Sequence, residues 1–512
     1  MQRPLSMASL VIITIALPLA TFMQVLDTSI ANVVLPAIAG DFGVSPNQAT
    51  WVITSFAASN AIALPLSGWL ARRFGEVRTF VGATLMFTLV SWLCGLATSL
   101  PMLVFLRVVQ GAVAGPMIPL SQSLLLANYP QHLKGMALAF TSMTVVVAPI
   151  FGPIVGGWIT DNISWPWIFY INIPIGLLSA YLGYIVLRER ETPTVRQPID
   201  AIGFALLVIG VGSLQVLLDK GNELDWFGSP FIVGLGAVAV VALAYFVTWE
   251  LTDRHPVVDL TLFRERNFTI GAVAVSLGFM VLFGSSVIFP LWLQPQMGYT
   301  ATWAGFAVAP IGFLTLLLSP VVGRTMHRVD PRLYACTSFL VFALVMFWMA
   351  SFTSEVSFGQ LVPPRLTMGI GLAFFFAPLI MIQIAGLDPA RMASALGLAN
   401  FLRVLAGSFG ASLSITLWDR REAMHFSQLV EHISLYDPAG LRALERMRAL
   451  GMGDQEALAQ VVRGATGQAY MLAINDVFMM GAWICLALFM LVWFSRPPFS
   501  PGAKAGAGAG AH

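Results

Sequence analysis

The sequence contains few charged residues for its length. Charged side chains make up only 10% of its 512 residues, whereas soluble domains carry roughly 25%. Hydrophobic residues make up 57%, and a soluble protein of this length could not cover such an apolar excess with polar surface. Lysine and arginine exceed aspartate and glutamate by only 27 to 25, so no basic face attracts polyanions. The composition excludes an ordinary cytosolic enzyme, a disordered chain and a nucleic-acid-binding protein.

Residues that hold metals or carry out catalysis are also scarce. The three cysteines, Cys94, Cys336 and Cys485, all lie in apolar stretches, which argues against a disulfide framework or a thiolate metal cluster. The six histidines fall outside the apolar runs, so we expect neither an imidazole proton relay nor a metal site inside a membrane. The chain has no phosphate-binding Gly-Lys-Ser/Thr loop. We expect no enzymatic activity, no cofactor, no metal and no transport driven by ATP.

Long apolar runs dominate the sequence instead. About 20 apolar residues cross a bilayer as a helix, and their unbroken character predicts helices rather than barrel strands. We identify fourteen candidate spans, at roughly 10–33, 48–70, 79–98, 102–126, 136–160, 167–187, 201–218, 231–250, 268–293, 303–323, 333–352, 360–386, 393–418 and 471–494. The chain is therefore predicted to be an all-α integral membrane protein with 14 transmembrane helices.

Basic residues are distributed unevenly among the connections between these spans. Alternate connections carry most of them, for example Arg78, Arg190 and Arg266, whereas the opposite short connections hold only Lys220. Connections rich in lysine and arginine stay in the cytoplasm. We therefore expect both termini to be cytoplasmic and the long segment 419–470 to face outward.

Weak matches at one offset indicate an internal repeat. Gly43 recurs 255 residues later as Gly298, and the run 103–107 with Gly111 recurs 258 residues later as 361–365 with Gly369. The shift is eight helices, which fits two six-helix bundles with two inserted helices between them. We predict an N-terminal bundle at 1–200, inserted helices and linker at 201–267, a C-terminal bundle at 268–494 and a disordered cytoplasmic tail at 495–512. Parallel repeats suit a transporter that rocks its halves around a central site.

Five motifs support a family resemblance. They are Gly68–Arg78 after the second span, Leu106–Gly111 in the fourth, Ala148–Gly157 in the fifth, Leu26–Pro36 in the first and Trp167–Gly176 at the start of the sixth. Together they resemble the major facilitator superfamily, in its fourteen-helix drug:proton antiporter branch. The resemblance assigns motif positions to Gly68, Arg73, Gly75, Gly152, Pro153, Gly156 and Gly157. One departure is Arg72, where the family usually has aspartate, so a lock built on that acid does not carry over.

The resemblance implies a function and partners. It implies multidrug efflux across a bacterial inner membrane, driven by the proton motive force, in which hydrophobic drugs leave in exchange for protons by alternating access. It also implies a tripartite system with a periplasmic membrane-fusion adaptor of the EmrA type and an outer-membrane channel of the TolC type. An alternative is a proton-coupled transporter of one organic metabolite on the same fold. A non-transporting receptor is a third possibility, but it would leave the intramembrane charges without a purpose.

Asp27 is the candidate proton-coupling residue. It is a carboxylate deep in a long apolar run, where a charge costs several kcal/mol unless it is neutralised, paired or hydrated. Gln24, Asp27 and Thr28 share one helical face by their spacing. A purely structural hydrogen-bonding role for Asp27 is the alternative.

Arg107 is the candidate partner of that carboxylate. At 1.5 Å per residue, Asp27 and Arg107 lie at similar depths, roughly 8–13 Å from the outer ends of their helices. An ion pair is therefore possible, either as a switch or as a permanent packing contact.

Further polar and aromatic residues are candidates for the substrate site. Arg403 lies in the middle of a span, so it should face a cavity or a carboxylate, with Asp27 as one possible partner, whereas Arg365 is nearer a helix end and could extend to the interface. The proposed substrate-binding residues are Gln24, Asn32, Gln110, Asn400, Arg403, Phe22, Met23 and Phe375.

Two other segments have structural predictions attached. The glycines at 152, 156 and 157 allow close helix packing, and Pro149 and Pro153 should bend their helix. The outer segment 419–470 has mixed charge, and its runs 441–450 and 455–462 read as short amphipathic helices. We expect this segment to be either the docking surface for the adaptor or a solvated cap.

Overall fold

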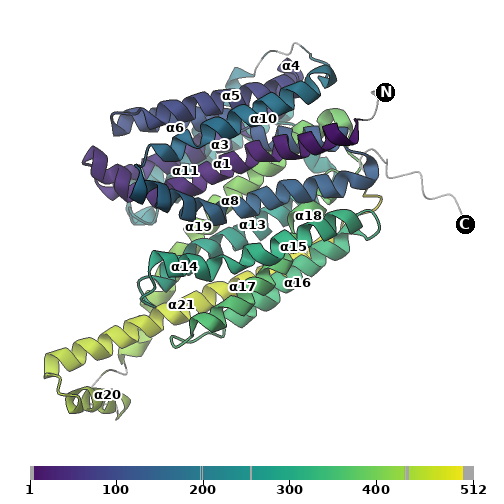
Figure 1. Ribbon diagram of the computed structural model, residues 1–512. Coiled ribbons are helices and arrows are strands. Elements are labelled where there is room, and N and C mark those ends of the chain that lie inside the picture. Colours follow the sequence, from purple (N-terminus) through teal and green to yellow (C-terminus); the bar gives the residue numbers. More distant parts are fainter. Residues whose placement is uncertain are drawn as a thin grey trace, which may run out of the picture.

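The computed structural model describes residues 5–195, 198, 200–253, 256–431, 433 and 438–499. Within these ranges the chain forms helices joined by turns, with no strand, as the composition predicts. The chain forms two helical bundles, and α1 begins at the same end of the molecule as α21 ends (Figure 1). We call this the α4 end, and the opposite end the α20 end. The Gly/Ala-rich part of the tail, 500–512, lies outside the described residues.

The N-terminal bundle is built on its first helix, which packs against α8 and α10, while α3 packs on α6 and α5 on α10. Its helices are α1 (Met7–Phe42), α2 (Pro46–Ala49), α3 (Trp51–Ala63), α4 (Ser67–Phe74), α5 (Glu76–Gly95), α6 (Leu100–Ala114), α7 (Met117–Asn128), α8 (Lys134–Asn162), α9 (Trp167–Tyr170) and α10 (Asn172–Leu187).

The C-terminal bundle follows two inserted helices, α11 (Ala201–Lys220) and α12 (Pro230–Thr252), which pack on each other. In this bundle α13 packs on α19, α15 on α17, and α16 and α19 on α21. Its helices are α13 (Arg266–Leu293), α14 (Ala301–Val308), α15 (Pro310–Thr325), α16 (Pro331–Met349), α17 (Phe358–Ala373), α18 (Phe376–Gln383), α19 (Met392–Glu431), α20 (Pro438–Ala449) and α21 (Asp454–Val492).

The number of membrane spans is close to the predicted fourteen. Twelve helical segments of the described chain are long and apolar enough to cross a membrane, or thirteen if the bent α8 counts as one span. The remaining position is the predicted span 48–70, which divides into α3, with 13 residues, and α4. The division falls at Pro65, because proline cannot continue the hydrogen-bonding pattern of a helix.

The internal repeat is visible in matching backbone positions. Gly43 after α1 and Gly298 after α13 both have left-handed backbones, with φ of +64° and +69°. A Cβ added at Gly111 would collide with the carbonyl oxygen of Phe56, and one added at Gly369 with that of Ile311. Each pair lies one repeat apart, at the contact of α6 with α3 and of α17 with α15. The same close helix contact is therefore present in both bundles.

The segment 419–470 is not an extended loop. α19 continues as one helix to Glu431, and α21 begins at Asp454, so two membrane helices project from the bundle toward α20 (Figure 1). The predicted short helix at 441–450 is present as α20, whereas the predicted 455–462 is the first part of the long α21. At 1.5 Å per residue each projection extends about 20 Å. The mixed charge therefore lies on a helical hairpin.

Candidate functional site

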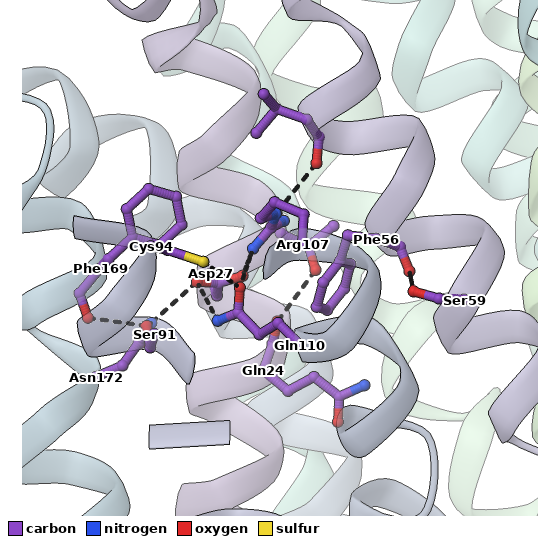
Figure 2. Close-up of polar contacts among 12 residues, drawn as sticks. Gln24, Asp27, Phe56, Ser59, Ser91, Cys94, Arg107, Gln110, Phe169 and Asn172 are labelled. Carbon is purple, nitrogen blue, oxygen red and sulfur yellow. Dashed lines mark hydrogen bonds and ion pairs between the residues drawn. The ribbon is translucent and has the colours of Figure 1, made fainter. Parts of the chain in front are cut away.

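Three helices place polar side chains around one carboxylate in the N-terminal bundle. α1 supplies Asp27, α6 supplies Arg107 and Gln110, and α10 begins at Asn172. Figure 2 shows their polar groups directed at one another. All four residues are buried, with at most 3% of their surface exposed.

The carboxylate and the guanidinium form an ion pair, as their predicted depths suggested. Nη1 of Arg107 lies 2.6 Å from Oδ2 of Asp27, and the two side chains are 0% and 1% exposed. Gln110 bridges the pair: its Oε1 accepts a hydrogen bond from the same Nη1 at 2.7 Å, and its Nε2 donates to Oδ1 of Asp27 at 3.4 Å. Because water is excluded, these charge-assisted bonds are stronger than they would be at a surface.

Asn172 is a further partner of the carboxylate that the sequence analysis did not identify. Its Nδ2 donates to Oδ1 of Asp27 and to Oγ of Ser91, both at 2.9 Å. Ser91 in turn donates to the backbone carbonyl of Phe169 at 2.9 Å. In the sequence, the sign of such a contact is an amide side chain at the start of an apolar run, because an amide that becomes buried needs hydrogen-bond partners. The carboxylate is thus linked to α5 and α10 as well as to α6.

The guanidinium has further contacts on its other side. Nε of Arg107 donates to the carbonyl of Val52 at 3.1 Å, and the group lies 4.2 Å from the ring centre of Phe56. Among the described residues its Nη2 has no hydrogen-bond partner. A buried charge without its counter-ion is strongly destabilising, so the position of Arg107 depends on Asp27.

The glycines of the fifth predicted span bring α8 against α1, close to this pair. A Cβ at Gly152 would collide with Ser29, and one at Gly156 would lie 2.8 Å from Cγ2 of Ile30. One at Gly157 would meet no atom of the described residues within 4 Å, so this third glycine is not part of the close approach. α8 bends by 43° between Pro149 and Ile154, where the prolines were expected to bend it. The side chains of Pro153 and Asn32 lie outside those that the structure describes.

A small cavity lies between the two bundles. The N-terminal bundle contributes Gln122 from α7 and Thr141 from α8, and the C-terminal bundle contributes Phe376, Asn400 and Arg403. It has room for about one water molecule, so the bundles nearly close around it. Nδ2 of Asn400 donates to Oε1 of Gln122 across the gap at 3.0 Å.

Arg403 faces this cavity, as expected, but Asp27 is not its partner. Its Nη2 donates to Oδ1 of Asn400 at 2.9 Å. The guanidinium lies 5.1 Å from the ring centre of Phe279 and 5.8 Å from that of Phe376. In the described part of the chain, Arg403 forms no salt bridge. It is therefore a cation held by two aromatic rings and an amide.

The other proposed substrate-binding residues lie inside the bundles. Phe375 is 0% exposed and packs edge-on against the rings of Phe339 and Phe376. Met23 is fully buried and Phe22 partly buried on α1, where Gln24 is also buried, one turn before Asp27. Of this aromatic run, Phe376 rather than Phe375 lines the cavity.

The motif after the second span closes the α4 end. A Cβ at Gly68 would come 2.8 Å from Cα of Ser394 on α19, and Nη1 of Arg72 donates to Oγ of Ser394 at 2.9 Å. The positively charged Arg72 therefore bonds to a neutral hydroxyl across the two bundles, at a position where a family aspartate would carry a negative charge. Gly75 has φ of +93°, a conformation that favours glycine. Arg73 is half-buried on α4.

Two buried charged groups differ from what the sequence suggested. Arg365 does not extend to the interface: it is 1% exposed and lies 3.7 Å above the ring centre of Phe289. Its Nε and Nη2 have no hydrogen-bond partner in the part of the chain that the structure describes. A second buried carboxylate, Glu76, lies at the start of α5 and accepts a hydrogen bond from Ser123 at 3.0 Å. Whether each side chain is buried depends on the direction in which it points from its helix, and hydropathy does not determine that direction.

Comparisons with known proteins agree with this architecture. The family model of the Major Facilitator Superfamily matches residues 17–411. The chain is 51% identical to the multidrug export protein EmrB of Escherichia coli (strain K12), over 100% of this chain and 99% of that protein. It is 47% identical to the fatty acid resistance protein FarB of Neisseria gonorrhoeae, over 98% of each chain. The crystal structure of the human organic anion transporter MFSD10 (TETRAN) shares the fold, with a TM-score of 0.60, 11% identity, and 96% of this chain and 100% of that chain covered.

Proposed function

Because this chain belongs to the major facilitator superfamily, we propose that it exports hydrophobic drugs across the inner membrane in exchange for protons. The observation that carries the proposal is the buried Asp27, a carboxylate placed within a membrane helix among donors from two other helices. A group in such a place is a candidate for binding and releasing a proton. The similarity to proteins named for multidrug export supports the direction and the substrate class.

Protonation of Asp27 would change the forces between three helices. The neutral acid loses its charge attraction to Arg107, while the guanidinium keeps its bonds to Gln110 and to the carbonyl of Val52. The attraction between α1 and α6 is then reduced to a weaker hydrogen bond. Proton binding therefore favours a different position of α1.

A movement of α1 would reach the cavity through α8. Ser29 and Ile30, two and three residues after Asp27, contact the backbone of α8 at Gly152 and Gly156. The same helix lines the cavity with Thr141 and Ser142. Because the two glycines have no side chains, Ser29 and Ile30 pack directly on the backbone of α8, and a movement of α1 is transmitted to α8. This contact is the proposed link between proton and substrate.

The cavity between the bundles is the proposed substrate site. Such an interface is where transporters with parallel repeats bind their cargo. Phe376 and Phe279 offer aromatic surface, and Arg403 offers a cation that no acidic side chain neutralises among the described residues. Opening of the bundles would enlarge it to hold a hydrophobic compound. Gln122 and Asn400, which now bond to each other, would then be free to bind the compound.

The orientation of the chain follows from its basic residues. Their distribution favours an orientation with the α4 end in the cytoplasm and both termini on the cytoplasmic side. The close contacts there, at Gly68 with Ser394 and at Gly135 with Gly323, correspond to a transporter closed toward the cytoplasm. The hairpin of α19, α20 and α21 then projects into the periplasm.

This hairpin is the proposed docking site for an adaptor of the EmrA type, which would connect the pump to an outer-membrane channel of the TolC type. Its helices extend about 20 Å beyond the bundle, far enough to reach a soluble partner. Replacing α20 by a short Gly/Ser turn should abolish co-purification with the adaptor while transport in vesicles persists. Retention of the adaptor by this variant would contradict the docking role.

Transport by purified protein in vesicles tests the coupling. An inward-directed pH gradient is imposed, and the movement of a hydrophobic fluorescent dye against the protons is followed for wild type and Asp27→Asn. Wild type should expel the dye from the vesicles against the concentration gradient of the dye. The variant should carry the dye only down that gradient. The matched control is Asp161→Asn, an exposed acid at the end of α8, which should behave like wild type. Undiminished pH-driven transport by Asp27→Asn would refute the proposal.

A further inference from the structure

A groove runs along the outside of the C-terminal bundle between α19 and α21. Leu417 and Arg421 of α19 form one wall, and residues of α21 form the other. It encloses about 910 Å³, including the open space at its mouth. None of these residues takes part in the cavity between the bundles, so the proposed drug transport leaves this groove unexplained.

The wall formed by α21 is a continuous apolar face. Met480, Trp483 and Ala487 follow Asp476 at intervals of four, three and four residues, which places all four on one side of the helix. Trp483 is 62% and Met480 47% exposed. From Met480 to Ala487 the apolar part of this face is about 10 Å long at 1.5 Å per residue. It therefore extends about two thirds of the way through the hydrocarbon of one lipid leaflet, which is about 15 Å deep.

Charged groups of both signs lie at the outer end of this face. Nη1 of Arg421 lies 3.6 Å from Oδ2 of Asp476, and Nε2 of His425 lies 2.9 Å from the same oxygen. The side chains of Arg421 and Asp476 are 46% and 37% exposed, so each keeps capacity for a ligand. A half-exposed cation and a half-exposed anion at one end of an apolar groove match a headgroup that carries both charges.

We propose that this groove binds one phospholipid with a phosphate and a primary ammonium group, that is, a phosphatidylethanolamine. The phosphate accepts hydrogen bonds from Arg421, the ammonium donates to Asp476, and an acyl chain lies along Met480, Trp483 and Ala487. Guanidinium–phosphate and ammonium–carboxylate bonds are both charge-assisted, so the two ends of the headgroup are recognised separately.

The carboxylate selects among headgroups. A choline headgroup has no N–H to donate to Asp476. A glycerol headgroup has no positive charge, and its phosphate would lie beside the carboxylate without a compensating ammonium. Phosphatidylethanolamine alone among these three satisfies both Arg421 and Asp476. The site lies on the lipid-facing side of the bundle, so its occupant comes from the bilayer and needs no path through the transporter.

Native mass spectrometry of the full chain released from micelles tests the proposal. The protein is titrated with phosphatidylethanolamine, phosphatidylcholine and phosphatidylglycerol that carry identical acyl chains, and the bound lipid is counted. Wild type should retain one phosphatidylethanolamine about tenfold more tightly than either other lipid, as expected for one additional charge-assisted bond. Equal retention of the three lipids would overturn the proposal without any variant being needed.

Variants locate the site. Asp476→Asn should reduce the preference for phosphatidylethanolamine over phosphatidylcholine, because its amide oxygen accepts only a weaker hydrogen bond from the ammonium. Arg421→Gln should weaken all three lipids, and Trp483→Ala should weaken them without changing their order. The matched control is Arg420→Gln, which removes an exposed arginine one position away and should leave retention as in wild type. A headgroup preference that is undiminished in Asp476→Asn would contradict the proposal. A dimer of wild type that Trp483→Ala dissociates would assign the groove to a second copy of the chain instead.

Discussion

The buried pair of Asp27 and Arg107 should respond unequally to the loss of either charge. Asp27→Asn leaves a guanidinium that stays protonated and retains only neutral acceptors, Gln110 and the carbonyl of Val52. Removing one partner of a buried pair costs about 3–5 kcal/mol, and we expect a loss of unfolding free energy in this range. Arg107→Gln should cost less, about 1–3 kcal/mol, because the carboxyl can bind a proton and keeps its bond from Asn172.

The double variant completes the comparison. Asp27→Asn combined with Arg107→Gln leaves no charge in the site, so it should be more stable than Asp27→Asn alone. Unfolding in mixed micelles with an increasing fraction of sodium dodecyl sulfate, followed by tryptophan fluorescence, gives the four free energies. Their double-mutant cycle isolates the coupling between the two side chains.

A second ion pair with similar geometry serves as the control. Asp259 and Arg391 lie 2.7 Å apart, close to the 2.6 Å of the buried pair, but their side chains are 22% and 33% exposed. Asp259→Asn should therefore cost no more than about 1 kcal/mol. The reasoning is refuted if Asp27→Asn costs no more than this control, or if Arg107→Gln proves the more damaging single change.

Three other substitutions test separate parts of the structure. Gly156→Ala would place a methyl group 2.8 Å from Ile30 and should cost about 1–3 kcal/mol of unfolding free energy. Gly157→Ala, whose methyl group meets no atom of the described residues within 4 Å, should leave the free energy of unfolding unchanged. Equal losses in the two variants would contradict this. Arg403→Gln should weaken binding of a carboxylate-bearing dye about tenfold in a fluorescence titration and that of a neutral dye less; equal effects would remove the role of its charge. Arg365→Met removes a buried cation whose Nε and Nη2 have no acceptor among the described residues. The free energy of unfolding should therefore stay the same or rise by about 1–4 kcal/mol. A clear loss in the same unfolding assay would show that the charge is compensated.

The ion pair could be anticipated from the sequence because helix geometry is regular. Each residue advances a helix by 1.5 Å, so counting from the helix ends placed Asp27 and Arg107 at one depth, and the structure has them in contact. The internal repeat was predictable for a similar reason, since Gly111 and Gly369 serve the same close helix contact. Depth and repeated spacing are properties of a single helix or motif, and sequence records them.

Contacts that depend on the rotation of one helix against another could not be predicted in this way. Asn172 reaches Asp27 only because α10 packs on α1. Arg365 faces the ring of Phe289 rather than the interface because of how α17 is turned. Hydropathy is nearly uniform around such helices, so it gives no preferred direction.

The outer segment shows a different reason for a missed prediction. Its sequence predicts short amphipathic helices at 441–450 and 455–462, yet α19 runs without a break to Glu431 and α21 begins at Asp454. No proline or glycine occurs between Asp419 and Asp437, and alanine, glutamate, leucine and arginine favour helix. The helix therefore continues because no helix-breaking residue interrupts it, whereas the predicted span ends at 418, where the apolar run ends.

The release of protons when substrate binds tests the central claim most directly. Purified protein in weakly buffered detergent is mixed with a hydrophobic dye that carries no ionisable group, and a pH indicator records the protons set free. Wild type should release protons on binding, whereas Asp27→Asn should bind the dye and release none. Equal release by the two proteins would show that the proton exchanged for drug is not held by the carboxyl group of Asp27.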